Sequence, residues 1–332
     1  MKDVWGILSY RTFKLSVLGS LSAVLVLLAV ACSEKSDVPI VVVEAADFSF
    51  TLPDSIEGGL VRLQLTNTGQ DPHHMQLLKL NVGVSQEQMS QVFQSIAEAM
   101  PTEGEAAMFR IFEAATLAGG PAGVGAGGKS DVTLNIAPGE YTLICLLVGA
   151  DRIPHVNKGM VRALTVTAPD GDGPTSIEAD VTVTLNDFAF TGAPTSLSAG
   201  ETTIKVVNAG REPHEMGLLK LKGVTFGELR DRMTNASQGQ RSPGPPPFDF
   251  AGGFQAIMPG EEGWATLDLT SGEYALICFV PSPAEDFTPH FAPGHDGVDH
   301  RRIASRSRFR LDWVERAGRD LHPFLPDAKC LR

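Results

Sequence analysis

The stretch 67–75 reads Asn-Thr-Gly-Gln-Asp-Pro-His-His-Met, and the stretch 208–216 reads Asn-Ala-Gly-Arg-Glu-Pro-His-Glu-Met. After one further residue, both continue Leu-Leu-Lys-Leu. An Asp-Phe-x-Phe motif precedes each stretch, at 47–50 and 187–190. Two more motifs follow: Gly-Glu-Tyr-x-Leu-Ile-Cys at 139–145 and 272–278, and Pro-His at 154–155 and 289–290. Four landmarks in the same order indicate an internal duplication.

Apolar and polar residues alternate with a period of two inside each repeat. The clearest segments are 61–65, 132–136, 203–206 and 265–269. This pattern, bounded by Gly, Pro and Asn, is typical of half-buried strands spaced as in a β-sandwich. One helix is expected in each repeat, because Ser85 with Gln88 and Thr225 with Glu228 have the spacing of a capping box. The Met and Phe residues that follow these caps are expected to face the core.

A length of 332 residues suggests two domains of ordinary size, each with its own core. The boundaries we predict are 38–167 for the first domain, 168–175 for a polar Pro- and Gly-containing linker, and 176–294 for the second domain. The glycine-containing stretches 119–128 and 242–253 are expected to be flexible surface loops.

The first 31 residues have the pattern of an export signal. A basic start is followed by an apolar run, which ends Leu-Ala-Val-Ala at 28–31, directly before Cys32. Small residues before a cysteine resemble the lipobox of bacterial lipoproteins, so we predict a signal peptide at 1–31, lipidation of Cys32 and a short tether at 32–37. A plain secretory signal and an uncleaved anchor helix are the alternatives. All three place the body outside the cytoplasm, in the periplasm or at the cell surface.

Two of the four cysteines hold equivalent places in the repeats. These are Cys145 and Cys278, whereas Cys32 and Cys330 have no counterparts. Equivalent single cysteines in separate domains are poor partners for a disulfide bond. They are better interpreted as one ligating or reactive thiolate in each repeat.

Soft and borderline metal ligands accompany each of these cysteines. The candidates in the first repeat are His73, Cys145, His155 and Met160, and those in the second are His214, Cys278 and His290. Two imidazoles, a thiolate and a distant thioether make a type 1 (blue) copper site. Any one of these residues alone is more often solvated or core, but the ordered set occurs twice. His74 is a weaker candidate, because its equivalent is Glu215, and Met75 and Met216 are interpreted as packing.

Over residues 38–294 the chain resembles the cupredoxin family, which includes plastocyanin, azurin and the copper nitrite reductases. The resemblance rests on Asn-x-Gly-x-x-Pro-His at 67–73 and on Gly-x-Tyr-x-x-x-Cys at 139–145, followed by Pro-His at 154–155 and Met160. It implies Greek-key β-sandwich domains and one type 1 copper per domain, held by the ligands named above. The loop between Cys145 and His155 is longer than in small plastocyanins and nearer the length in copper nitrite reductases.

The leading hypothesis for function is one-electron transfer by bound copper, in an electron carrier rather than a catalyst. The alternatives are a copper carrier or storage protein, a two-domain copper oxidoreductase of the nitrite-reductase type, and a metal-free scaffold that binds a partner. No His flanks Cys145 or Cys278, which disfavours the enzyme. A net charge of −12 argues against nucleic acid and favours a basic, cytochrome-like redox partner.

The repeat ends near Gly294. The first repeat continues with Met160 and an apolar strand, whereas residues 295–332 begin His-Asp-Gly-Val-Asp-His and show no alternation. Codons exist for 294–302 that, read one base later, encode Gly-Met-Met-Ala-Trp-Ile-Thr-Val, which restores both a Met and a strand. One hypothesis is therefore a frameshifted tail, expected to leave the second sandwich one strand short. The other is a genuine second site in which His295 takes the place of the Met.

Overall fold

The structure is a computed structural model and describes residues 38–149, 151, 153–237, 239–240, 244–291 and 302–306. The elements of the first repeat are β1 (Ile40–Ala46), β2 (Ser49–Thr51), β3 (Ser55–Glu57), β4 (Gly59–Asn67), β5 (Gln76–Leu80), α1 (Gln86–Glu103), η1 (Gly104–Glu113), β6 (Ala115–Leu117), β7 (Lys129–Ile136), β8 (Gly139–Ile144), η2 (His155–Lys158) and β9 (Val161–Thr167). Those of the second are β10 (Val181–Asn186), β11 (Ala189–Thr191), β12 (Ser196–Ser198), β13 (Gly200–Asn208), β14 (His214–Leu221), α2 (Phe226–Ser237), β15 (Phe248–Ile257), β16 (Glu262–Leu269), β17 (Gly272–Ile277), β18 (Pro281–Ser282), η3 (Pro283–Glu285), β19 (Thr288–Pro289) and β20 (Arg302–Arg306). The chain is mainly β, and the four alternating segments lie within β4, β7, β13 and β16, as predicted.

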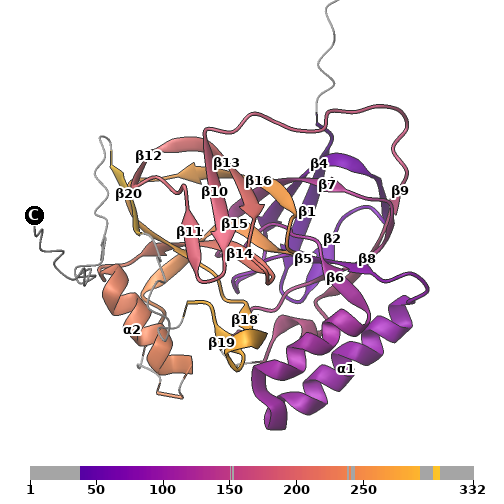
Figure 1. The fold of residues 1–332 in the computed structure, drawn as a ribbon, viewed down its shortest axis with the longest axis horizontal. Coiled ribbons are helices and arrows are strands. Elements are labelled where there is room, and N and C mark those ends of the chain that lie inside the picture. Colours follow the sequence, from indigo (N-terminus) through magenta and orange to yellow (C-terminus); the bar gives the residue numbers. More distant parts are fainter. Residues whose placement is uncertain are drawn as a thin grey trace, which may run out of the picture. The chain divides into compact units, whose positions relative to one another are not determined.

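One layer of the sandwich is a single sheet that runs through both repeats. Its eight strands have the order β11-β10-β13-β16-β7-β4-β1-β2 (Figure 1). The repeats meet where β7 and β16 pair antiparallel, with Val132 opposite Ala265. These two residues hold the same place in their repeats, so the contact pairs equivalent strands.

The other layer contains the sheets β3-β9-β8-β5-β6 and β12-β20-β17-β14-β15. The segment 118–124 lies between them and forms isolated bridges to β15, with Ala118 opposite Ile257 and Val124 opposite Ala251. The prediction of flexible surface loops is therefore wrong for 119–124, which is buried, and for 248–253, which belongs to β15. Glycine is required here for close approach: a Cβ on Gly120 would clash with the Met75 carbonyl group. 

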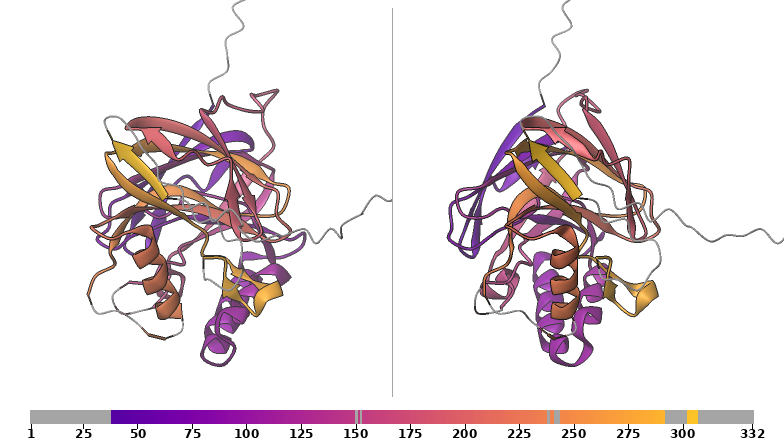
Figure 2. Two further views of the ribbon diagram at one scale, coloured as in Figure 1. Left: turned by 60° about the vertical axis from the view of Figure 1, so that its left-hand side comes forward. Right: turned by 90° about the vertical axis from the view of Figure 1, so that its left-hand side faces the viewer.

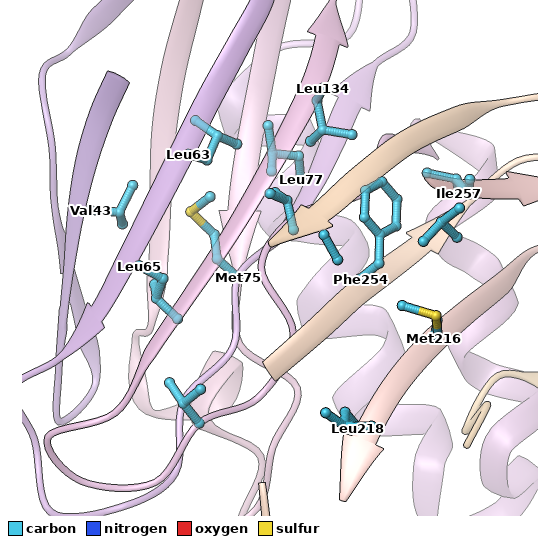
Figure 3. Close-up of a cluster of buried hydrophobic side chains, with 14 of the residues drawn as sticks. Val43, Leu63, Leu65, Met75, Leu77, Leu134, Met216, Leu218, Phe254 and Ile257 are labelled. Atoms are coloured by element: carbon cyan, nitrogen blue, oxygen red, sulfur yellow. The ribbon is translucent and has the colours of Figure 1, made fainter. Parts of the chain in front are cut away.

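The largest buried cluster contains side chains from both repeats. Figure 3 shows Met75 and Leu77 of the first repeat beside Met216, Phe254 and Ile257 of the second. We expected a separate core in each domain, but the β7–β16 pair and the 118–124 bridges bring the two sets of apolar residues together. Both repeats belong to one compact unit, and the domain boundaries proposed from sequence stay predictions.

Both predicted helices are present, with the expected caps. Ser85 and Gln88 form a capping box at the start of α1, and the Thr225 hydroxyl accepts a hydrogen bond from Glu228 N ahead of α2. Met89 and Ile96 of α1 are buried against β5 and β8, while Leu229 of α2 packs on β14 and β17. Both helices lie on the same side of the sandwich (Figures 1 and 2). No helix in the described part of the chain is long and apolar enough to cross a membrane.

Most of the segment 295–332, including His295 and Cys330, lies outside the described residues, as do Cys32 and the expected signal. Residues 302–306 form β20, which pairs with β12 and β17. This is the place that β9 takes between β3 and β8 in the first repeat. The second sandwich is therefore not short of a strand, contrary to what the frameshift hypothesis led us to expect.

Candidate functional site

The first candidate site forms where three chain segments meet. His73 precedes β5, Cys145 follows β8, and His155 is the first residue of η2. All three side chains are buried, and their potential ligand atoms lie within 4.8 Å of one another. The Nδ1 atoms of His73 and His155 are 3.1 Å apart, and Cys145 Sγ is 3.5 Å from His155 Nδ1. The structure therefore brings these three of the four predicted ligands together.

Met160 is held next to this group by its backbone. Its N–H donates to the carbonyl oxygen of His155 at 2.9 Å, and its carbonyl oxygen accepts from Cys145 N at 3.4 Å. The side chain is fully buried in the same apolar cluster as Cys145. Its place beside the site fits the predicted axial ligand, and that role stays a prediction.

The second repeat builds an equivalent group. His214 begins β14, Cys278 follows β17, and His290 follows β19. Cys278 Sγ lies 3.9 Å from His214 Nδ1 and 3.4 Å from His290 Nδ1, and the three side chains are at most 3% exposed. A small cavity adjoins them, with about 10 Å³ available to the centre of a water molecule. It is lined by Leu185, Asn186, Phe188, Ala189, Phe190, His214, Cys278 and His290.

The donor atoms of both groups suit one metal ion each. Nitrogen and thiolate ligands lie about 2.0–2.3 Å from a metal, so two ligands of one ion are about 3.3–3.8 Å apart at tetrahedral to trigonal angles. The His73–His155, Cys145–His155, Cys278–His214 and Cys278–His290 separations of 3.1–3.9 Å lie close to this range, and all ligand atoms of each group are within 4.8 Å of one another. Two imidazoles with one thiolate is the donor set that selects copper in trigonal sites. The residues present therefore fit copper.

Protonation in these groups favours metal binding by the imidazoles. Burial lowers the pKa of His155, and the neighbouring His73 lowers it further. Burial also lowers the pKa of His214 and of His290, although nearby carboxylates oppose the shift. These rings are therefore neutral at neutral pH and keep a nitrogen lone pair. Burial raises the pKa of the Cys145 thiol to about 12, and a metal would have to displace its proton.

Carboxylates contact the Nε2 atoms of three imidazoles, a feature that the sequence analysis did not predict. Asp47 Oδ1 lies 3.0 Å from His73 Nε2, and Asp187 Oδ1 lies 3.1 Å from His214 Nε2. Glu212 Oε2 accepts from His290 Nε2 at 2.9 Å. Such partners place the proton on Nε2 and leave Nδ1 free for a metal. The signal was present in the repeated Asp-Phe-x-Phe motif and in the acidic residue two places before each upstream histidine, Asp71 and Glu212.

In the first repeat the counterpart of Glu212 is Asp71. Its Oδ2 lies 3.6 Å from His155 Nε2, which is beyond a hydrogen bond. The two sites therefore differ in how firmly the downstream histidine is held: the longer Glu side chain reaches the ring, and the shorter Asp side chain does not.

The Asn-x-Gly part of the motif positions the upstream histidine. Asn67 is buried and donates to the carbonyl oxygens of Asp71 and Val124, while its own side-chain oxygen accepts from Gly69 N. Asn208 makes the equivalent three bonds. These bonds fix the turn that leads into the histidine.

The glycine of this motif leaves room for the acid–histidine pair. A Cβ on Gly69 would clash with the Asp47 carboxylate and lie 2.8 Å from His73 Nε2. At Gly210 it would lie 2.5 Å from His214 Nε2 and 2.6 Å from Asp187 Oδ1. The motif therefore keeps glycine because the carboxylate and the imidazole meet directly above it.

In neither repeat does the residue after the upstream histidine belong to the ligand group. His74 Nε2 accepts a hydrogen bond from Leu146 N at 2.6 Å, and Glu215 Oε1 accepts from Phe279 N at 2.8 Å. Burial, with the adjacent His155 and His73, lowers the pKa of His74 to about 3. Burial raises the pKa of Glu215 to about 7. Two chemically different side chains thus brace the backbone next to the cysteine.

Backbone N–H groups point at each sulfur. Cys145 Sγ accepts from the N–H groups of His74 and Leu147. Cys278 Sγ accepts from Glu215 N at 3.5 Å and from Val280 N. Both cysteines are free and buried, so within the described residues neither forms a disulfide bond. Met75 and Met216 are fully buried in the apolar core, as predicted.

No protein-family profile and no curated protein sequence matches the chain. Solved structures do match. Auracyanin from Roseiflexus castenholzii is 17% identical and covers 40% of this chain and 98% of its own, with a TM-score of 0.25. Auracyanin A from Chloroflexus aurantiacus, a blue copper protein, is 18% identical over 40% of this chain and 100% of its own, with a TM-score of 0.27. The copper nitrite reductase of Nitrosomonas europaea is 12% identical over 81% of this chain and 94% of its own, with a TM-score of 0.22. The solved structures that match include cupredoxins and two-domain copper proteins.

Proposed function

We propose that this chain is an extracytoplasmic copper protein that passes single electrons through two type 1 sites. One copper would be held by His73, Cys145 and His155, with the Met160 thioether as a further ligand. The other is held by His214, Cys278 and His290. The observation that carries the proposal is the pair of buried groups in which two imidazole nitrogens and a sulfur converge.

Bound copper supplies a one-electron couple, because thiolate and thioether ligands suit Cu(I) and imidazoles suit Cu(II). The chain's own contribution is to keep these ligands in one place in both oxidation states. Carboxylates fix three of the four rings from behind, and backbone N–H groups fix each sulfur. Rigid ligands lower the reorganisation that accompanies electron exchange.

The same rigidity favours an electron carrier over a copper carrier. A carrier must release its ion, which requires ligands that open to solvent, and all six histidine and cysteine ligands are at most 3% exposed. A two-domain oxidoreductase would need a further copper with an open position. Among the described residues only the two groups above could hold a metal through histidine, cysteine and acidic side chains.

The proposal includes a place and a partner. Lipid on Cys32 would hold the protein at the membrane, outside the cytoplasm, and stable anchoring of this kind needs more than one acyl chain. With a net charge of −12, the surface would attract a basic redox partner such as a cytochrome.

Copper titration of the metal-free protein tests the proposal. We expect two equivalents of Cu(II) to give an intense visible thiolate-to-copper band and the EPR signal of a type 1 site, and we expect reduction to bleach the band reversibly. Cys145→Ser and Cys278→Ser should each remove one part of the band, and the double variant should remove all of it. A wild-type protein that stays colourless would refute the proposal and favour the metal-free scaffold.

A further inference from the structure

A two-residue turn contacts both histidines at each site. In the first repeat, Asp47 and Phe48 connect β1 to β2, with Ala46 paired to Ser49 across the turn. In the second, Asp187 and Phe188 connect β10 to β11 in the same way. The metal-site motifs do not include this dipeptide, yet it occurs at the same place in both repeats.

The phenylalanine of this turn has a strained backbone. Phe48 has φ of 66° and Phe188 has φ of 62°, in the left-handed region that glycine and asparagine adopt far more readily. Among the described residues only four that are not glycine have positive φ, and these are two of them. A bulky residue kept in this conformation at two equivalent places suggests a role that outweighs the local strain.

The two side chains of the turn contact different imidazoles of the site. The Asp47 carboxylate meets Nε2 of His73, and the Phe48 ring packs edge-to-face on His155, with ring centroids 5.2 Å apart. The second repeat does the same, since Asp187 meets His214 and the rings of Phe188 and His290 are 4.8 Å apart. One dipeptide therefore fixes two ligands that come from distant parts of the chain.

Each turn is itself anchored. The Asp47 carboxylate accepts from the backbone N–H groups of Gln70 and Asp71, and Lys158 Nζ lies 4.3 Å from the centre of the Phe48 ring. The Asp187 carboxylate accepts from both the backbone and the guanidinium group of Arg211. The hydrogen bonds hold each turn against the segment before the upstream histidine, and Lys158 ties the first turn to η2, which begins at the downstream histidine.

We propose that the Asp-Phe turn is a clamp that presets the geometry of the copper site. Phe48 and Phe188 act as positioning residues: each ring fixes the plane of the downstream histidine and helps to keep water from it. The strained φ places the ring over that histidine instead of over solvent. This inference rests on the proposed function, because it concerns how the site holds copper.

The test uses the full chain carrying Cys278→Ser, so that only the first site gives a thiolate band. Phe48→Gly and Phe48→Asn both tolerate the left-handed backbone but lack the ring. We expect each to lose copper to an excess of chelator about tenfold faster than the parent, as for other residues that support metal ligands. We also expect a shifted visible band. The matched control is Phe50→Leu, on the same hairpin but buried in the core, which should lower the apo-protein's unfolding midpoint without changing copper release.

The outcomes separate this inference from the proposed function. A parent that shows no copper–thiolate band would mean that the proposed function fails. A parent with the band, and Phe48 variants with an unchanged band and release rate, would overturn the clamp alone. If neither Phe48 variant folds, the clamp is also overturned, since the residue would then serve the fold. Phe188→Gly in a Cys145→Ser background repeats the test independently at the second site.

Discussion

Replacing Gly69 by alanine should damage the first site through one identified contact. The added Cβ would clash with the Asp47 carboxylate and lie 2.8 Å from both Asp47 N and His73 Nε2. The backbone and the buried imidazole have little room to move, so the cheapest relief is rotation of the Asp47 side chain. That rotation breaks its 3.0 Å contact with His73 and its bonds from Gln70 N and Asp71 N.

The expected losses of copper affinity and of stability follow from the contacts that the substitution breaks. Loss of a partner that orients a metal-bound histidine typically weakens metal binding by about 10–100-fold, or about 1.4–2.7 kcal/mol. The apo protein should lose about 1–2 kcal/mol of stability, since each lost hydrogen bond is worth about 0.5–1.5 kcal/mol and the partly exposed carboxylate regains some water. Copper affinity is measured by competition with a chelator in the Cys278→Ser background, and stability by denaturant unfolding.

Two controls make the reasoning refutable. Gly125→Ala adds the same methyl group where nothing lies within 4 Å and φ is not positive, so its copper affinity should match the parent's. If the clash acts through Asp47, then Asp47→Ala combined with Gly69→Ala should bind copper no more weakly than Asp47→Ala alone. A Gly69→Ala protein with the parent's affinity, or full additivity in the double variant, would show that the substitution does not act through the Asp47–His73 pair and would refute this reasoning.

Three further predictions concern other parts of the chain. Asn67→Ala removes a buried amide that makes three hydrogen bonds, so chemical denaturation should show a loss of about 2–4 kcal/mol, and an unchanged midpoint would contradict the proposed bracing role. Cys32→Ala should release the protein from membranes on fractionation, because the acyl anchor is lost; a processed variant that still sediments with membranes would count against lipidation. Resequencing the gene across codons 293–302 tests the frameshift hypothesis, which requires the alternative frame to encode a Met in register with Met160.

The sequence was sufficient to propose the two candidate groups, because their donor types recur in the same order in both repeats. His73, Cys145 and His155 could be proposed from donor type and order alone, and the second repeat supplied an independent copy. The carboxylates behind the rings could not be assigned in this way. Asp47 lies on a different hairpin from His73, and only the folded chain shows that its turn meets the Asn-x-Gly turn from the other side.

The glycine-containing segments show the limit of composition as a guide. Gly119 and Gly120 looked like a flexible loop, because glycine also populates loops. In the fold they are buried, and the segment hydrogen-bonds to β5 on one side and to β15 on the other. Local sequence does not record whether a glycine provides mobility or close approach, since that depends on a partner strand more than a hundred residues away.

The contact between the repeats has a consequence for how the sites are arranged. Ala118 faces Ile257, and Val124 faces Ala251. Ala251 is the counterpart of Ala118 in the second repeat, and Ile257 is the counterpart of Val124. Each of the two residues therefore faces the counterpart of the other, as in a two-fold symmetric dimer. Three antiparallel steps separate β5 from β14, through the segment 118–124 and β15. β5 and β14 therefore run in opposite directions.

Because His73 leads into β5 and His214 begins β14, the two upstream ligands lie at opposite ends of the strands in this layer. The shared sheet and core therefore join the repeats without merging their sites. Each site keeps its own loops, its own acid–histidine pair and its own Asp-Phe turn, and the two differ at residues such as His74 and Glu215, or Asp71 and Glu212, each of which contacts one site. Such side chains can differ between the two sites, while Val124 and Ile257 of the shared contact accept hydrogen bonds from Asn67 and Asn208 and so link each site to that contact.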